Sequence, residues 1–320
     1  MNLQATNSVG VVGLNYWGPN LARNFADLGT LSWLCDLDEQ RLAAAQARHP
    51  GATATASYDE LLASDVSGVV IATAVPSHYP LAKQALEAGK HVFVEKPPAM
   101  RAAEIDELVT LAADRDLVLM PGHLLLYHPG VQKLKQLIDD GELGEVQCVY
   151  GNRQNLGIVR SNENALWSLG VHDLSVILHL LDEDPELATA QGRWSIHQGV
   201  EDVVFCFLRF PSGKIAHMHL SWLDPHKMRK MTVVGREKMV VFDDMEPERK
   251  VTVYEKKALA SGETVSGDIS IPRISTAEPL RLECEYFLEL LDGRHDRGKV
   301  ARDGARVVRA LEMLTNSLNG

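Results

Sequence analysis

The chain has little of what binds nucleic acids or crosses membranes. Its 32 Lys and Arg residues are outnumbered by 43 Asp and Glu, which gives a formal net charge of −11. Nucleic acids and anionic membranes are bound by clustered cations, so we expect neither as a partner. No apolar run approaches the roughly 18 residues of a membrane span, and residues 1–8 lack the basic segment that opens a signal peptide. These absences predict a cytoplasmic protein.

Cysteine is scarce and scattered. A disulfide framework or a zinc site needs closely and regularly spaced thiols, and this sequence has no C-x-x-C pair, so we expect buried free thiols instead. His217 and His219 alternate along one predicted strand without a third ligand, so we expect no metal site there either. The cysteines are Cys35, Cys148, Cys206 and Cys284.

The chain does have the size and apolar content of a two-domain globular protein. Its 320 residues are 45% hydrophobic, and domains usually hold about 100–200 residues. We expect a dinucleotide-binding domain at 1–121 and a substrate-binding and oligomerisation domain at 122–320, with C-terminal helices that can pack back on the first domain.

Strands and helices alternate in the first third. Continuous apolar strands separated by amphipathic helices predict a parallel sheet covered on both faces, and such sheets bind ligands beyond the carboxyl ends of their strands. The expected strands are Val9–Gly13, Leu31–Asp36, Gly68–Thr73, His91–Glu95 and Leu117–Met120. The expected helices are Asn20–Phe25, Asp38–Ala47, Tyr58–Ala63, Ser77–Ala88 and Arg101–Arg115.

The first strand leads into an imperfect dinucleotide fingerprint. The pattern G-x-G-x-x-G reads Gly13-x-Asn15-x-x-Gly18, and the following helix N-terminus suits a pyrophosphate. Asparagine enters the left-handed region more readily than most residues and can donate from its amide, so the turn can survive the missing glycine. We assign this turn, including Tyr16 and Trp17, to cofactor binding.

A carboxylate follows the second strand. Asp36 lies 23 residues after Gly13 (36 − 13), close to the ~20 expected for an acid that binds the adenosine ribose. Such an acid repels a 2′-phosphate, and Leu37 supplies no compensating cation, so NAD is favoured over NADP. The alternative is that Asp36 caps the next helix, a role that Asp38 could fill equally well.

A strand delivers an acid and a base to the same rim of the sheet. The run V-F-V-E-K-P-P ends with Glu95, Lys96 and two prolines, which hold the lysine on extended backbone. The segment after strand Gly68–Thr73 also falls at this rim. The candidates for cofactor binding here are Thr73, Pro76, His78 and Glu95.

These motifs together resemble the Gfo/Idh/MocA oxidoreductases. The resemblance implies an N-terminal Rossmann domain and a C-terminal α+β domain with a large, mainly antiparallel open sheet. Residues 16–20 and 221–227 are similar to the branch acting on nucleotide-linked sugars, especially the UDP-N-acetylglucosamine and UDP-N-acetylglucosaminuronate 3-dehydrogenases. This branch implies lipopolysaccharide or polysaccharide biosynthesis. Besides the glycine turn and Asp36, the matching segments are 72–78, 95–97, 122–129, 164–173 and 221–227.

The resemblance also places a catalytic histidine at His172. A lone histidine on an apolar helix is usually a core residue, and the aspartate that the family carries four residues earlier is Ser168 here. Lys96 and His172 remain as the working pair. His172 would take the hydroxyl proton while the C3 hydride moves to NAD, and Lys96, oriented by Glu95, would stabilise the alkoxide; the two bases could exchange roles.

Polar residues before the His172 helix are candidates for substrate binding. Arginine matches phosphate oxygens at two points, so this region could hold sugar and diphosphate groups, with a solvated loop as the competing interpretation. His123, at the domain junction, could line the sugar pocket. The other candidates are Arg153, Asn155, Arg160, Asn164, Ser168 and Asp173.

The second domain shows alternating strands joined by hairpin turns. The expected strands are Val146–Tyr150, Asp202–Phe210, Lys214–Trp222, Lys230–Val234, Met239–Phe242 and Lys250–Tyr254. The expected helices are Val131–Asp139, Leu174–Leu181, Arg281–Leu291 and Ala301–Asn316, and residues 262–275 form a loop with at most one short strand. A sheet this large with one face uncovered would expose an apolar patch, so we expect a homodimer or homotetramer through it.

Two other functions stay open. One is a dehydrogenase or reductase of a free sugar or polyol. The other is an NAD-binding regulator without turnover, which the departures at Asn15 and Ser168 would suit, although both Lys96 and His172 are retained.

Overall fold

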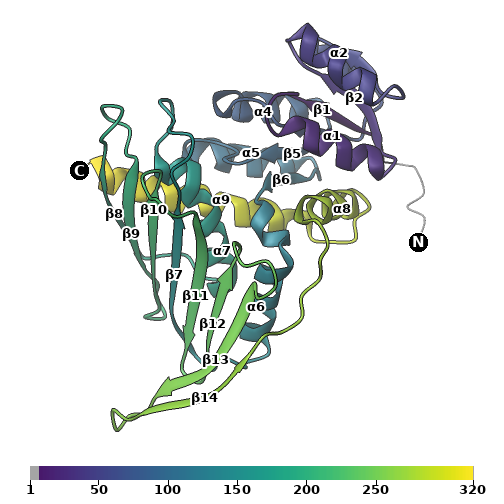
Figure 1. The fold of residues 1–320 in the computed structure, drawn as a ribbon. Coiled ribbons are helices and arrows are strands. Elements are labelled where there is room, and N and C mark those ends of the chain that lie inside the picture. The colour runs from purple at the N-terminus through teal and green to yellow at the C-terminus, as the bar shows by residue number, and fades with distance from the viewer. Residues whose placement is uncertain (1–6, 320) are drawn as a thin grey trace. The chain divides into compact units, whose positions relative to one another are not determined.

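The computed structural model describes residues 7–319 (Figure 1). The chain forms two compact units. Unit 1 holds the residues up to Leu124 together with Glu278–Val308, and unit 2 holds Leu125–Ala277 and the residues from Arg309 onward. The last helix, α9 (Arg297–Asn319), therefore contributes to both units.

Unit 1 contains a six-stranded parallel sheet with the order β3-β2-β1-β4-β5-β6. This is the doubly wound order of a Rossmann fold, so the predicted fold is confirmed. Its strands are β1 (Val9–Val12), β2 (Leu31–Cys35), β3 (Thr53–Thr55), β4 (Gly68–Ile71), β5 (His91–Glu95) and β6 (Leu119–Gly122). Its helices are α1 (Gly18–Asp27), α2 (Glu39–Arg48), α3 (Tyr58–Ala63), α4 (His78–Glu87), α5 (Ala102–Asp114) and α8 (Pro279–Leu291).

Local sequence explains most of these boundaries. All residues of β1 and β4 are buried, as expected for apolar runs covered on both faces. Helix α2 begins at Asp38, whose carboxylate accepts hydrogen bonds from the backbone N–H groups of Gln40 and Arg41, both at 3.0 Å. Asp38 rather than Asp36 is therefore the helix cap. The short strand β3 was not predicted, because Thr-Ala-Thr at a sheet edge has no apolar run.

Helix α8 packs on unit 1 although it comes from the end of the sequence. The ring of Phe287 makes edge-to-face contacts with Phe25, at a centroid distance of 6.2 Å, and with Phe93, at 5.7 Å. A Cβ at Gly68 would lie 3.1 Å from the Phe287 ring, so this glycine lets the helix approach β4 closely. Burying a phenylalanine contributes about 1.5–3 kcal/mol.

Unit 2 contains an eight-stranded sheet with the order β14-β13-β12-β11-β7-β10-β9-β8. All neighbours are antiparallel except β7 and β10, so the predicted, mainly antiparallel sheet is confirmed. The strands are β7 (Val146–Gln154), β8 (Leu187–Arg193), β9 (Val203–Arg209), β10 (Ile215–Ser221), β11 (Met228–Gly235), β12 (Met239–Asp243), β13 (Val251–Ala258) and β14 (Thr264–Ser270).

Two helices, α6 (Pro129–Asp139) and α7 (Val171–Leu181), cover one face of this sheet (Figure 1). Helix α7 contacts β7, and α6 contacts β12 and β13. The edge strand β8 was not predicted, because its sequence L-A-T-A-Q-G-R lacks β-branched and aromatic residues apart from one threonine. Strand β14 lies within residues 262–275, which were predicted as a loop with at most one short strand, and every residue of it is exposed.

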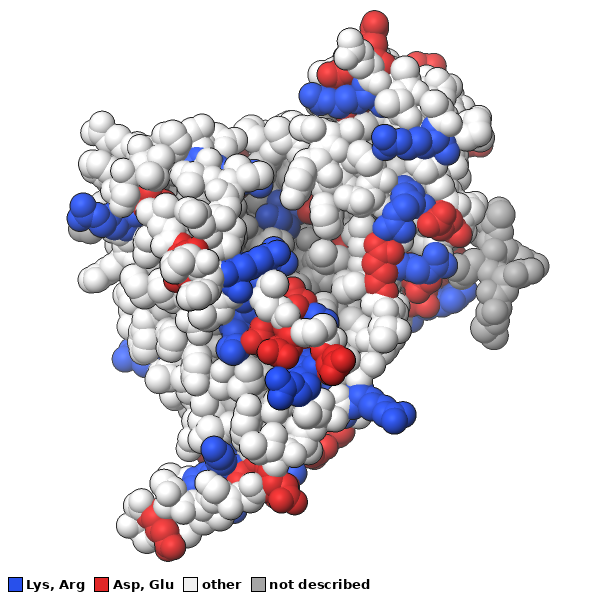
Figure 2. Space-filling view, viewed as in Figure 1, with Lys and Arg blue, Asp and Glu red and all other residues white. Residues whose placement is uncertain are grey.

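Charges are mixed on the surface. On the face seen in Figure 2, Lys and Arg side chains lie beside Asp and Glu side chains, and no extended basic surface appears on that face. Within residues 7–319, no helix is both long and apolar enough to span a membrane.

Candidate active site

The turn after β1 is built around two glycines that no other residue could replace without a shift. Gly13 has φ +88°, and a Cβ there would lie 2.8 Å from the carbonyl of Ala72. A Cβ at Gly18, the first residue of α1, would lie 1.8 Å from the carbonyl oxygen of Gly13. The backbone thus comes close to itself at a helix N-terminus, which is a cradle that fits the pyrophosphate of a dinucleotide.

Two of the four residues between these glycines lie on the surface, whereas Leu14 is 4% exposed. Asn15 and Tyr16 are exposed, with Tyr16 77% accessible. Positive φ angles among the described non-glycine residues occur only at Asp116 and Asp182. Asn15 therefore does not use the left-handed conformation considered from its sequence, and the missing second glycine does not distort the turn.

Asp36 fixes this turn to the end of β2. Its carboxylate accepts hydrogen bonds from the backbone N–H of Leu14 at 2.6 Å and of Asp38 at 2.8 Å, and the residue is only 8% exposed. A carboxylate has about four lone-pair sites, so two remain for ribose hydroxyls. A guanidinium nitrogen of Arg41 lies 3.9 Å from Asp36, a neighbouring cation that the sequence analysis missed because it looked only at Leu37.

The loop after β4 is tied to the loop after β5. The hydroxyls of Thr73 and Ser77 are 2.7 Å apart. The imidazole of His78 is 1% exposed, with Nδ1 2.8 Å from the carbonyl oxygen of Pro97 and Nε2 3.0 Å from that of Thr73. His78 thus faces backbone rather than open space, whereas Pro76, another predicted cofactor contact, is exposed.

Glu95 lies at the carboxyl edge of the sheet and has two hydrogen-bond donors as neighbours. It accepts a hydrogen bond from the backbone N–H of Lys96 at 3.2 Å and another from the indole of Trp17. Burial raises the pKa of Glu95 to about 7, although the Lys96 charge and these donors act in the opposite direction. A predicted cofactor residue, Trp17, therefore contacts the acid beside the predicted catalytic lysine.

His123 lies at the end of β6, at the same edge. It is 4% exposed, and neither ring nitrogen has a hydrogen-bond partner within the described part of the chain. Burial, followed by the charge of Lys96, lowers the pKa of His123 to about 4, so the imidazole is neutral near pH 7. His123 is thus a neutral ring near Lys96 whose two buried nitrogens have unused hydrogen-bonding capacity.

Helix α8 brings a second acid toward this edge that sequence reasoning missed. Glu283 is fully buried, and neither carboxylate oxygen has a hydrogen-bond partner among residues 7–319. Burial, and then the charge of Glu95, raises the pKa of Glu283 well above its usual range. The sequence did hold a signal for it, because Glu283 is the single acid on the apolar face of this helix.

In unit 2, His172 lies in the first turn of α7. This helix is preceded by a π-helical turn, η3 (Leu166–Gly170), a feature frequent at functional sites. The carbonyl oxygen of His172 accepts a hydrogen bond from the Ser175 hydroxyl at 2.8 Å, while its side chain is partly exposed on an otherwise buried helix. Ser168 lies in the π-helical turn and is 8% exposed.

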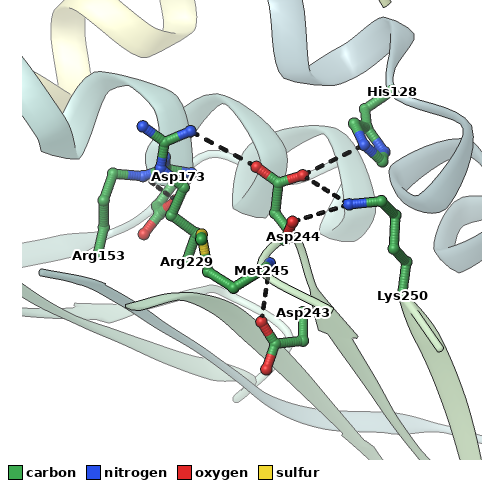
Figure 3. A network of polar contacts seen from close by, with 8 residues as sticks. All are labelled: His128, Arg153, Asp173, Arg229, Asp243, Asp244, Met245 and Lys250. Atoms are coloured by element: carbon green, nitrogen blue, oxygen red, sulfur yellow. Dashed lines mark hydrogen bonds and ion pairs between the residues drawn. The ribbon is translucent and has the colours of Figure 1, made fainter. Parts of the chain in front are cut away.

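Arg153 and Asp173 form a buried ion pair (Figure 3). The Nε and Nη2 atoms of Arg153 lie 2.8 and 2.7 Å from one carboxylate oxygen of Asp173, and Gly151 leaves room for the acid. Both were predicted to bind substrate. They line a small recess with Arg229 and Lys230, and the Arg153 guanidinium there is already paired with Asp173.

A second network that was not predicted lies beside this pair (Figure 3). Asp244 is approached by His128 at 3.4 Å, by Lys250 at 3.3 Å and by Arg229 at 3.6 Å. Nδ1 of His128 accepts the N–H of Gly130 at the start of α6, so Nε2 carries the proton toward Asp244. These contacts join the ends of the neighbouring strands β11, β12 and β13 to the start of α6, and no motif in the sequence marks them.

The other predicted substrate residues make local contacts in unit 2. The Asn164 amide accepts from Trp167 N–H at 3.2 Å and donates to Glu201 at 2.8 Å. Arg160 is paired with Glu163 at 2.9 Å, and the backbone N–H of Asn155 donates to the Ser221 carbonyl at 3.1 Å.

The two sheet histidines have aromatic partners. The ring of His217 stacks on Tyr150 at 5.0 Å, and that of His219 on Phe205 at 4.2 Å. In the stretch 7–319, no three His, Cys, Asp or Glu side chains are placed to hold a metal ion.

Lys96 and His123 thus belong to unit 1, and His172 belongs to unit 2. The pairing of Lys96 with His172 stays a prediction. What the geometry of unit 1 provides by itself is a nucleotide cradle and an acid, a base and a neutral imidazole at one edge of a parallel sheet.

Two family models match the chain. Residues 7–123 match the one described as "Oxidoreductase family, NAD-binding Rossmann fold", and residues 131–241 match the one described as "GFO/IDH/MocA C-terminal domain".

Three relatives of this chain carry the names of three different enzyme activities. The 2,7-anhydro-N-acetylneuraminate hydratase of Escherichia coli is 30% identical over 65% of this chain and 59% of its own length. UDP-N-acetylglucosamine 3-dehydrogenase of Acidithiobacillus ferrooxidans is 28% identical over 73% of each chain. Inositol 2-dehydrogenase 2 of Paenarthrobacter aurescens is 31% identical over 66% of this chain and 68% of its own. The chain thus spans 59% of the length of the Escherichia coli hydratase, and 60% of that of a matched oxidoreductase of Streptococcus pneumoniae.

Solved structures agree in fold. UDP-N-acetylglucosamine 3-dehydrogenase from Acidithiobacillus ferrooxidans has a TM-score of 0.84 at 24% identity, with 97% of both chains covered. GenD2 from gentamicin A biosynthesis, in complex with NAD, has a TM-score of 0.82 at 26% identity, covering 98% of this chain and 95% of that one.

We predict that Gly18→Ala weakens NAD binding at least ~10-fold, a loss of about 1.4 kcal/mol, because the new Cβ would collide with the Gly13 carbonyl 1.8 Å away. Gly51→Ala is the matched control, since a Cβ at Gly51 has no heavy atom within 4 Å. Isothermal titration with NADH, alongside circular dichroism to verify folding, measures both. Equal affinity in the two variants would show that the turn does not hold the cofactor.

Proposed function

Because the chain belongs to the Gfo/Idh/MocA family of oxidoreductases, we propose that it is an NAD-dependent dehydrogenase of a nucleotide-linked sugar. The proposed substrate is UDP-N-acetylglucosamine or its uronate, oxidised at the C3 hydroxyl to the 3-keto sugar. The observation that carries the proposal is the edge of unit 1, where the glycine cradle, Glu95, Lys96 and neutral His123 occur together. The Acidithiobacillus relative supports the choice of sugar.

The chemistry assigns one task to each residue. Bound NAD⁺ supplies the hydride acceptor. The Lys96 ammonium stabilises the oxygen as it becomes an alkoxide, and Glu95 holds that ammonium in place. His172 accepts the hydroxyl proton, so the alcohol loses a hydride from carbon and a proton from oxygen. His123 orients the sugar through one of its open ring nitrogens.

A second candidate is oxidation of a free polyol, which the inositol dehydrogenase relative favours. The same Lys96 and His172 chemistry would serve such a substrate. The difference lies in the diphosphate, which only a nucleotide sugar carries.

We predict that incubation with NAD⁺ and a panel of UDP-sugars, dTDP-sugars and free polyols yields a two-dalton loss on a UDP-sugar. Lys96→Ala and His172→Ala should each lower kcat by roughly 10²–10⁴-fold, the usual contribution of a general acid or base. Lys83→Ala and His197→Ala are controls, because Lys83 pairs with Glu107 on the surface and His197 is exposed. Oxidation confined to the polyols would favour the second candidate, and near-normal turnover of either active-site variant would refute the assignment.

We propose that the cofactor is NAD rather than NADP. The Asp36 carboxylate, which lies at the end of β2, would accept the ribose hydroxyls and repel a 2′-phosphate. Arg41 weakens this preference, because it lies 3.9 Å from Asp36 and can turn toward a phosphate. The Asp36 carboxylate is nevertheless held at the turn, because it accepts a hydrogen bond from the backbone N–H of Leu14 at 2.6 Å.

Asp36→Ser should therefore shift the ratio of kcat/KM for NAD to kcat/KM for NADP toward NADP by roughly 10-fold or more, since it removes a charge and leaves Arg41 in place. Asp38→Ser is the matched control: it also removes an acid that contacts Arg41, but one that only caps α2. Steady-state kinetics with both cofactors give the ratios. An unchanged ratio in the Asp36 variant would mean that another group selects the cofactor.

We also propose that two or four copies assemble through the uncovered face of the unit 2 sheet. This face carries apolar side chains on neighbouring strands, with Phe205 54% and Phe207 40% exposed on β9 and Ile215 37% exposed on β10. Their register places Phe207 opposite His217, which stacks on Tyr150, so the apolar surface is continuous across β9, β10 and β7. Burying such a surface against a second copy is favourable.

Phe205→Glu combined with Phe207→Glu should convert the assembled protein to a monomer, because charges would be buried at the interface. Leu37→Glu, at an 88% exposed site in unit 1, is the control and should leave assembly unchanged. Analytical ultracentrifugation measures the mass of each variant. A wild type that sediments as a monomer, or a double variant that remains assembled, would exclude this interface.

A further inference from the structure

His78 makes two hydrogen-bond contacts, and a neutral imidazole cannot satisfy both at once. Its Nδ1 lies 2.8 Å from the carbonyl oxygen of Pro97 and its Nε2 lies 3.0 Å from the carbonyl oxygen of Thr73. Both partners only accept hydrogen bonds. A neutral ring has one donor nitrogen and one lone pair, so it would leave a lone pair facing a carbonyl. A ring protonated on both nitrogens satisfies both contacts.

The two carbonyls belong to the two loops that form the candidate site. Thr73 follows β4, and Pro97 follows Lys96 at the end of β5. Proline fixes its own φ, so a hydrogen bond to its carbonyl leaves little freedom in the peptide units beside Lys96. The imidazole is only 1% exposed, which shields both bonds from competition by water.

We propose that His78 is a positioning residue: its imidazole, carrying a proton on each nitrogen, joins the loop after β4 to the Lys96–Pro97 segment and thereby holds Lys96 in its working position. The inference rests on the proposed function, and it gives His78 a task different from direct contact with the cofactor. His78 is fixed at the first residue of α4 and is linked to the Lys96 segment through the backbone carbonyl of Pro97.

Burial and the positive N-terminus of α4 oppose a charge on His78. Two charge-assisted hydrogen bonds favour it, and they are stronger than the neutral kind. The elements packed against α4 carry Glu95 and Lys96 on the β5 side and Glu104 and Glu107 on α5. The α5 acids bond to Arg101 and to Tyr79 and Lys83, respectively, so local partners already engage them.

His91 offers a matched comparison within unit 1. Its Nδ1 accepts a hydrogen bond from the backbone N–H of Val118 at 2.9 Å, so that nitrogen carries no proton. Burial, and then the charge of Arg297, lowers the pKa of His91 to about 4. His91 lies at the amino end of β5, whereas Lys96 follows the carboxyl end of that strand. The His91 ring should be neutral at pH 7.

The test is nitrogen NMR of the full chain labelled with ¹⁵N-histidine at pH 7, with signals assigned through His78→Phe and His91→Phe. Both ring nitrogens of His78 should resonate as protonated nitrogens, whereas His91 should show one unprotonated nitrogen. An unprotonated nitrogen on His78 would overturn the proposal. This readout needs no turnover, so it stands even if the substrate proposed above is wrong.

Kinetics of the same variants test the positioning role. His78→Phe should lower kcat roughly 10-fold or more, because a displaced lysine loses alignment with the reacting oxygen, while KM for NAD changes less than about threefold. His91→Phe should retain kcat. Equal kcat in the two variants would overturn the role. If circular dichroism shows that His78→Phe is unfolded, His78→Gln replaces it: one donor remains, so an intermediate kcat supports the role and a wild-type kcat excludes it.

Discussion

The desolvated carboxylate of Glu95 is the contact on which the candidate site depends. It accepts the backbone N–H of Lys96 and the indole N–H of Trp17, so it links the end of β5 to the turn that opens α1. A Cβ at Gly122 would lie 3.3 Å from the Cα of Glu95 and 3.4 Å from its carboxyl carbon, so a side chain at this position of β6 would crowd Glu95. An apolar residue at position 95 would leave two donors without their acceptor in a partly buried place.

Glu283 shows how the fold limits the charge at this edge. Phe93 and Glu95 lie on one face of β5, two residues apart, and Phe287 and Glu283 lie one turn apart on α8. The contact between Phe93 and Phe287 therefore brings Glu95 and Glu283 toward one another, which is consistent with the charge of Glu95 acting on Glu283. Because burial and the charge of Glu95 raise the pKa of Glu283 well above its usual range, a second negative charge beside Glu95 is disfavoured.

Sequence reasoning succeeded where chemistry follows from adjacent residues. Gly13, Gly18, Glu95 and Lys96 could be placed because parallel strands end at one edge and the motifs directly follow apolar runs. It missed Glu283 near Glu95, which depends on packing between distant parts of the chain. It also missed Arg41, which lies five residues after Asp36 in the first turn of α2. Strand β8 was missed because an edge strand with a single β-branched residue and no aromatic one resembles a loop.

The family's aspartate is replaced by Ser168 in this chain, so the contacts of the other acid near His172, Asp173, become important. Asp173, next to His172 in the sequence, is committed to Arg153 by two bonds to one carboxylate oxygen, at 2.8 and 2.7 Å. It is therefore a poor second carrier for a proton taken by His172. Glu95, whose pKa burial brings to about 7, can exchange a proton near neutrality beside Lys96. Under the proposed function, proton transfer through the lysine gains importance where the family's aspartate is missing.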